Sequence, residues 1–267
     1  MPASRITVAV LLACASAGTW AQPSPWSYEV TGSVLHRRLV ERTATGGTLL
    51  TETGPLARVQ LQATHPLPGD GAFAVRGELA GGDLDYDGRT QAGAPLRTTT
   101  RHVEGGASFL VRPHAPAPWG ELWAGAGWQR QYRGIRGTAV AGGLAETADA
   151  VWLVLRWRSP EWQGPAGWWI RAEPEVRASL AHNLKVDFHG VLDTTSLEAG
   201  QQRAIVLRLV ATAPDSPWSW GLEWRRLSQA ASLPVPVSLR GVPVPGTTLF
   251  QPKLSTRDLG LTLTRRF

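Results

Sequence analysis

The chain ends with the stretch LGLTLTRRF, residues 259–267, and this stretch decides the fold. One parity of it carries apolar side chains: Leu259, Leu261, Leu263 and Phe267. The other parity carries polar ones: Thr262, Thr264 and Arg266. A period of two is typical of a β-strand with one apolar and one polar face. Chain ends are usually polar and frayed, so a strand that stops on an aromatic ring predicts an apolar surrounding for that ring.

The first 21 residues have the features of an export signal. Arg5 supplies a positive charge, residues 6–13 are apolar, and Thr19-Trp20-Ala21 is a small-x-small cleavage site. We expect cleavage after Ala21, which leaves residues 22–267 as one β-barrel domain. A buried N-terminal helix and a lipoprotein signal at Cys14 are the alternatives.

The composition of the remaining chain excludes several classes of protein. Cys14 is the only cysteine, so the mature chain has no disulfide and no cysteine-ligated metal. Removal of Arg5 lowers the formal net charge from +6 to +5, which is moderate. No stretch after the signal is apolar for about 18 residues, so we expect no transmembrane helix.

Two kinds of break divide the chain into alternating segments. Short proline-rich breaks lie at residues 65–71, 112–120, 159–167 and 213–218. Longer breaks rich in glycine, threonine and charge lie near residues 42–54, 81–100, 134–148, 178–200 and 229–252. Four short turns that alternate with five long loops require ten strands. The sequence therefore predicts an all-β fold, an antiparallel up-and-down β-barrel of ten strands, with eight or twelve strands as alternatives.

The predicted strands separate apolar from charged side chains. One face carries residues such as Val59, Leu61, Leu153, Leu207 and Leu222. The opposite face carries Arg156, Arg158, Arg171, Glu173, Glu175, Arg177, Arg208, Glu223 and Arg225. A soluble sandwich shows the same alternation. Strand lengths near the ~9–11 residues that cross a bilayer, and tryptophans where strands meet breaks, favour a transmembrane barrel with an aromatic girdle.

The closing strand resembles the terminal signal of Gram-negative outer-membrane β-barrels, in which alternating apolar residues end in Phe. Arg265 departs from the pattern, because an apolar or aromatic residue is expected two places before the end. The resemblance implies location in the cell outer membrane, contact with the lipid bilayer, and recognition of Phe267 by the outer-membrane assembly machinery.

A ten-stranded barrel has a narrow lumen, which the inward arginines and glutamates would largely fill. We therefore expect a plugged barrel with a structural or surface-interaction role that its extracellular loops perform. A narrow channel is a further alternative.

Two loop motifs could carry chemistry. The stretch GDLDYDG contains Asp83 and Asp85, and the stretch KVDFHG contains Asp187 and His189. His189 could act as general base on a water, with Asp187 orienting its ring and the Asp83 and Asp85 carboxylates binding the same water. The alternative is that these are ordinary turn and loop residues.

The spacing of both motifs resembles the omptin family of outer-membrane proteases, which have an Asp-x-Asp pair in the second long loop and an Asp-x-His pair in the fourth. The resemblance implies a catalytic set of Asp83, Asp85, Asp187 and His189, an endopeptidase activity, and lipopolysaccharide as a partner. It rests on these two tripeptides, and the lipopolysaccharide-binding residues of the family have no recognisable counterparts in this chain.

Other motifs predict no further chemistry. The remaining histidines are scattered without metal spacing, so we expect no metal and no cofactor. Basic residues alternate with carboxylates on the lumen face, which disfavours nucleic-acid binding.

Overall fold

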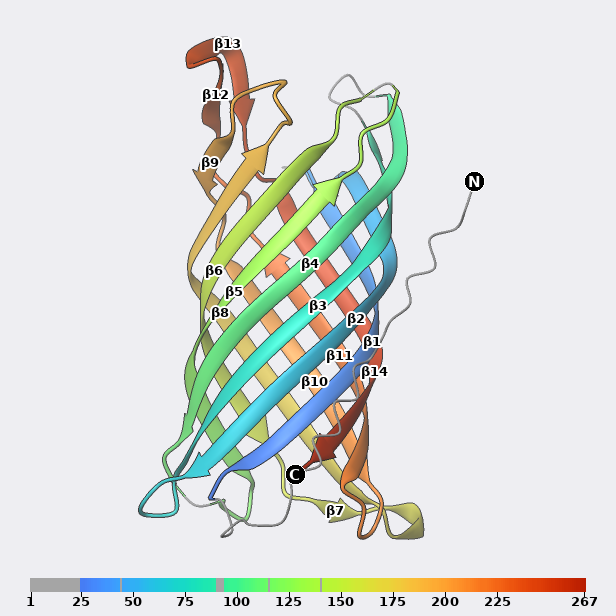
Figure 1. Cartoon of the computed structure of the whole chain (residues 1–267), viewed down its shortest axis with the longest axis vertical. Coiled ribbons are helices and arrows are strands. Elements are labelled where there is room, and N and C mark those ends of the chain that lie inside the picture. The colour runs from blue at the N-terminus through green and yellow to red at the C-terminus, as the bar shows by residue number, and fades with distance from the viewer. Residues whose placement is uncertain (1–24, 44, 90–93, 115, 140) are drawn as a thin grey trace, which may run out of the picture.

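Ten antiparallel strands close into a barrel (Figure 1). The computed structural model describes residues 25–43, 45–89, 94–114, 116–139 and 141–267, and the predicted signal peptide, residues 1–21, lies outside these ranges. The barrel strands are β1 (Ser27–Arg42), β2 (Thr48–Pro66), β3 (Ala72–Arg89), β4 (Pro95–Arg112), β5 (Glu121–Ile135), β6 (Leu144–Arg158), β8 (Trp169–Asp187), β10 (Gln202–Thr212), β11 (Trp218–Gln229) and β14 (Lys253–Arg266). The predicted fold and the count of ten strands are confirmed.

Among the described residues, four short strands and one helical turn are additional to the ten barrel strands. Strands β7 (Trp162–Gln163) and β9 (Thr195–Glu198) pair with parts of β8. The 3-10 turn Pro165–Gly167 follows β7. Strands β12 (Val235–Leu239) and β13 (Val242–Leu249) form a hairpin at the end opposite the C-terminus (Figure 1). Within the described residues, no helix has the length and apolarity needed to cross a membrane.

The barrel closes where its first and last strands meet. Strand β14 pairs with β1 over fourteen residues, from Glu29↔Arg266 to Arg42↔Lys253. Beyond this ladder, the Phe267 N–H donates to the Tyr28 carbonyl at 3.0 Å, and the Tyr28 N–H donates to the Phe267 carbonyl at 3.3 Å. Among the described residues, closure leaves the ten-stranded wall without a free edge strand, which hydrocarbon requires because unpaired backbone groups are costly there.

The two faces of the wall divide as the alternation predicts. Outward side chains are apolar and exposed, for example Val34 (68 %) and Leu261 (65 %). Inward side chains are charged and buried, for example Arg58, Glu223 and Asp258. An apolar outer band around a polar interior is the arrangement of a barrel that spans a membrane.

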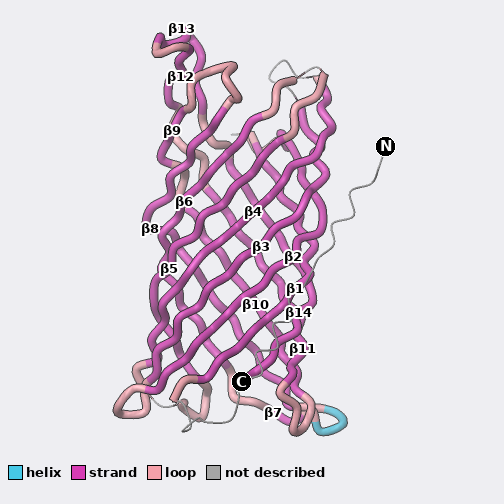
Figure 2. The backbone as a smooth tube through the Cα atoms, viewed as in Figure 1, coloured by secondary structure: helices cyan, strands magenta, loops and turns pink. Residues whose placement is uncertain are grey.

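The short proline-rich turns lie at the end of the barrel near the C-terminus, as predicted. The loops at the opposite end are shorter than predicted. Residues 48–54, 81–89, 95–100, 144–148 and 178–187 were predicted as loops and are strand instead. Figure 2 shows the strands running on nearly to this end, which we call the loop end. The prediction was wrong because polar outward residues of a strand that extends above the bilayer have the composition of a loop. Residues 229–252, which were also predicted as a loop, contain the β12–β13 hairpin.

Candidate functional site

The middle of the lumen is crossed by ion pairs that join distant strands. Glu223 on β11 accepts from Arg58 on β2 and from Arg208 on β10, at 2.6 Å in each case. Glu175 on β8 accepts from Arg76 on β3 at 2.8 Å. Strands β2 and β11 are separated by β1 and β14, and β3 and β8 by three strands. Inward charges therefore pair with one another across the lumen, as expected of charges buried away from water.

A second charged cluster lies nearer the loop end. Arg133 on β5 binds Glu41 at 2.7 Å, Glu52 at 2.7 Å and Glu146 at 2.8 Å. The other oxygen of Glu52 contacts His102 Nε2 at 2.6 Å. These contacts join β1, β2, β4, β5 and β6 around one guanidinium, so this part of the wall is also held from within.

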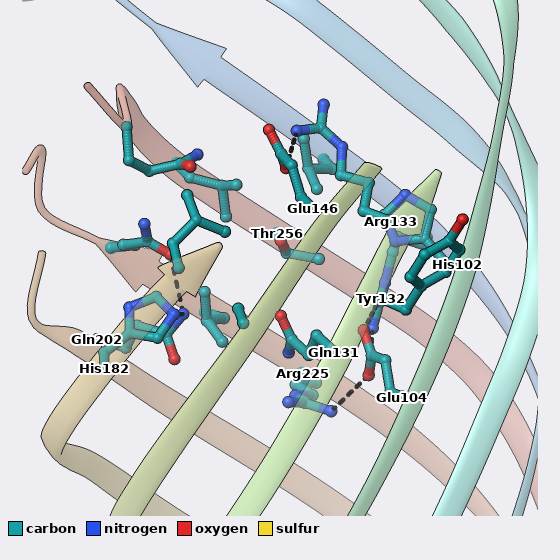
Figure 3. A pocket seen from close by; sticks show the side chains of 18 residues that line it. His102, Glu104, Gln131, Tyr132, Arg133, Glu146, His182, Gln202, Arg225 and Thr256 are labelled. Carbon is teal, nitrogen blue, oxygen red and sulfur yellow. Dashed lines mark hydrogen bonds and ion pairs between the residues drawn. The ribbon is translucent and has the colours of Figure 1, made fainter. Parts of the chain in front are cut away.

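A small cavity lies beside this cluster (Figure 3). Its volume is about 60 Å³, and its lining includes Glu104, Arg133, His182, Gln202 and Arg225. This is room for a few water molecules, since one water occupies about 30 Å³ of liquid. Within the described residues, no group of three His, Cys, Asp or Glu side chains could hold a metal ion.

Asp83 and Asp85 lie within β3 and not in a loop. Their side chains are exposed on the outer face, because the alternate residues Leu84 and Tyr86 are the ones buried inside. Asp83 pairs with Arg101 of the neighbouring strand at 3.2 Å. Both aspartates therefore point away from the lumen.

Asp187 is the last residue of β8. His189 lies two residues further along the chain and has a positive φ of 54°. The Asp187 carboxylate accepts from the His189 backbone N–H at 2.8 Å, which shapes the start of the loop. Strand β8 pairs with β6 and β10, not with β3. Among the contacts of the described residues, none joins this pair to Asp83 or Asp85, so their joint catalytic role stays a prediction.

A polar clamp fixes the hairpin at the loop end. Asp193 accepts from the backbone N–H of Gly241 at 2.7 Å, from the Ser238 hydroxyl at 2.8 Å and from the backbone N–H of Arg240 at 2.9 Å. The Gly241 N–H, with the other two donors, holds the pKa of Asp193 below its ordinary value. Arg240 and Gly241 both have positive φ, as a tight hairpin turn of the mirror-image type requires.

Sequence reasoning missed three of these features. The sequence predicts a loop at Glu52 and an isolated histidine at His102, and it does not indicate a role for Asp193. The alternation of Leu50, Glu52 and Gly54 with outward threonines was a usable signal for an inward Glu52. No local signal identifies Asp193, because its donors lie 45 or more residues further along the chain.

The comparisons with known proteins bear on the fold. Neither a scan against protein-family models nor a search of curated proteins gave a match. Among solved structures, the outer membrane protease OmpT from Escherichia coli is similar, with 9 % identity, coverage of 93 % of this chain and 99 % of that one, and a TM-score of 0.52. The chain is a barrel of the outer membrane. At 9 % identity the likeness to OmpT shows the fold and not the activity.

Two autotransporter structures also match. The translocator domain of NalP from Neisseria meningitidis has 7 % identity and a TM-score of 0.47, over 90 % of this chain and 88 % of that one. The β domain of the Bordetella autotransporter BrkA has 9 % identity and a TM-score of 0.43, over 90 % of this chain and all of that one. These TM-scores are too low to support a further argument.

Proposed function

We propose that the protein is a plugged barrel that acts through the surface at its loop end, in a structural or surface-interaction role. The observation that carries this proposal is the set of ion pairs that cross the lumen, with Glu223 fully buried between two arginines. A filled lumen leaves the outer surface and the loop end as the parts that can meet a partner.

The hairpin is the best candidate for the contact surface. Its tip exposes Leu239 (43 %) and Val242 (66 %). Below the tip, Val235 and Leu249 pack against a small apolar cluster of β8 and β9. The clamp and this packing hold the apolar tip in one orientation, and a fixed apolar tip is suited to contact with another surface.

Adhesion tests this role. Cells that display the protein are compared with cells that display L239S/V242S, for binding to other cells or to coated surfaces. We expect the protein to increase adhesion and the variant to lose most of the increase. The matched control is V34S, which changes an equally exposed valine within the bilayer band. Adhesion that is the same with and without the displayed protein would count against the proposal.

The second candidate is an omptin-like endopeptidase with Asp83, Asp85, Asp187 and His189 as the catalytic set. The similarity of the barrel to that of OmpT is the observation that favours it. The outward positions of Asp83 and Asp85 disfavour it, because general-base chemistry needs these groups within hydrogen-bond reach of one water.

Cleavage of basic peptides separates the two candidates. Protein refolded with lipopolysaccharide is incubated with these peptides, alongside H189A. If surface interaction is the role, neither protein cleaves. Cleavage that disappears in H189A would establish the endopeptidase, whereas equal cleavage by both would indicate a contaminating protease.

A further inference from the structure

The outer wall above the apolar band has two halves of different charge. On β3 to β6, three outward arginines each have an acidic partner on the neighbouring strand. The pairs are Arg101–Asp83 at 3.2 Å, Arg97–Asp87 at 3.6 Å and Arg130–Asp149 at 2.9 Å. We call this half the paired wall.

The other half carries three adjacent arginines. Arg38 on β1 lies directly opposite Arg257 on β14, which lies directly opposite Arg226 on β11. All three are exposed on the outer face, and we call them the arginine row. Among the described residues, none of the three has an acidic side chain in contact. Like charges at directly opposite positions repel, so this arrangement is unfavourable unless an anion lies against it.

The residues around the arginine row are also positively charged. Arg203, Arg42 and Lys253 lie on the same face, nearer the loop end. Every acidic residue of β1, β11 and β14 faces the lumen instead: Glu29, Glu41, Glu223 and Asp258. The three strands that carry the arginine row therefore supply no outward counter-charge to it.

The depth of the row indicates which anion meets it. The next outward residues toward the C-terminal end of the barrel are His36 before Arg38, Leu259 after Arg257 and Trp224 before Arg226. Leu259 is 53 % exposed in the apolar band. The row is therefore at the boundary between hydrocarbon and headgroups in the leaflet at the loop end. Phosphate groups of lipids lie at this depth, and basic side chains next to a membrane bind them.

The spacing of the row favours a headgroup with more than one phosphate. Neighbouring strands are about 4.8 Å apart, so the outer two arginines lie roughly 10 Å apart. A single phosphate diester carries one charge and cannot span three guanidinium groups. The geometry points to a binding site for a multiply phosphorylated glycolipid of this leaflet, whose phosphate oxygens accept paired hydrogen bonds from Arg38, Arg226 and Arg257. This site does not depend on the proposed surface-interaction role.

Lipid binding by the full mature chain in a neutral detergent tests the site, with lipid A bearing two phosphates as the probe. The test variant is R38Q/R226Q/R257Q, and the matched control is R97Q/R101Q/R130Q, which removes the three acid-paired arginines of the paired wall. We expect the test variant to weaken binding by about tenfold or more and the control to change it by less than about twofold. Equal affinities for the unmodified protein and the test variant would overturn the site.

Three further arms define the ligand. Lipid A with one phosphate removed and phosphatidylglycerol should both bind more weakly than the doubly phosphorylated lipid; equal binding of either would overturn the preference for several phosphates. Inorganic phosphate at the same concentration should not displace the lipid, and displacement would show that the row binds free phosphate. If the triple variant does not fold, as judged by heat-modifiable migration in gels, the single variant R257Q removes the central cation and should still weaken binding.

Discussion

At the scale of single residues, the surroundings of Arg265 explain how the last strand holds a charged side chain at a position where an apolar or aromatic residue is usual. Its guanidinium lies 4.6 Å from the centre of the Phe267 ring and 5.3 Å from that of the Trp218 ring. A guanidinium over an aromatic face is stabilised by the ring quadrupole, and its stem covers apolar surface. The departure from the terminal pattern is therefore accommodated by two neighbouring rings.

We expect protonation of the Asp193 carboxylate to have a measurable effect on the β12–β13 hairpin. Because the pKa of Asp193 is depressed in the folded protein, the clamp is fully present above the ordinary pKa of the carboxyl and is lost as the pH falls through the depressed value. The hairpin should thus stay closed from neutral to mildly acidic pH and open in stronger acid. Hydrogen exchange of the Arg240 and Gly241 amides, followed from roughly pH 7 to about pH 2, measures this after correction for intrinsic rates.

Substitution of Asp193 reproduces the effect at neutral pH. In D193N the amide nitrogen cannot accept from a backbone N–H, so trypsin should cleave after Arg240 several-fold faster than in the unmodified protein. The control is D187N, which removes a carboxylate that accepts from the His189 backbone N–H in its own loop. Unchanged cleavage in D193N would show that packing alone holds the hairpin.

At the scale of strands, the sequence predicted one end of the barrel better than the other. Proline marks the turns at one end because it cannot donate to a ladder in mid-sheet. At the loop end, glycine, threonine and charged residues occupy strands whose outer face meets water, where strand and loop compositions coincide. Strand β2 has 19 residues, against the ~9–11 that cross a bilayer. The surplus of about eight residues adds roughly 25 Å along the strand.

Local sequence also predicted only part of the candidate site. The inward charges could be predicted from alternation, but their partners could not, since Arg58 and Glu223 are 165 positions apart in sequence. Motif spacing predicts that Asp187 orients the His189 ring, and in the structure the Asp187 carboxylate accepts from the His189 backbone N–H. Motif spacing could not show that Asp83 faces outward, because one position along a strand reverses the side of the wall on which a side chain lies.

At the scale of the whole molecule, the crossed ion pairs predict a barrel that does not conduct ions. In planar bilayers the unmodified protein should give no steady single-channel steps. R58S/R208S/E223S removes one complete crossing cluster together with its bulk, and should give measurable steps. Steady conductance of the unmodified protein would establish the narrow channel instead.

The stability of the barrel should depend on the same cluster. E223Q leaves two buried guanidinium groups without their counter-charge, so we expect it to lower the free energy of unfolding by about 3 kcal/mol. The exposed pair Arg97–Asp87 provides the control, because D87N should change that free energy by less than about 1 kcal/mol. Urea titration of folded protein in detergent measures both.

Ion pairs that link β2 to β11 and β3 to β8 also have a mechanical consequence. A hollow cylinder flattens easily under sideways load, whereas one with internal struts keeps a round section. The buried arginine–glutamate links are struts in this sense, set at several heights and in several directions. Lateral pressure from the surrounding lipid should therefore deform this cylinder little, and the hairpin at its rim should keep its position when the bilayer is compressed or stretched.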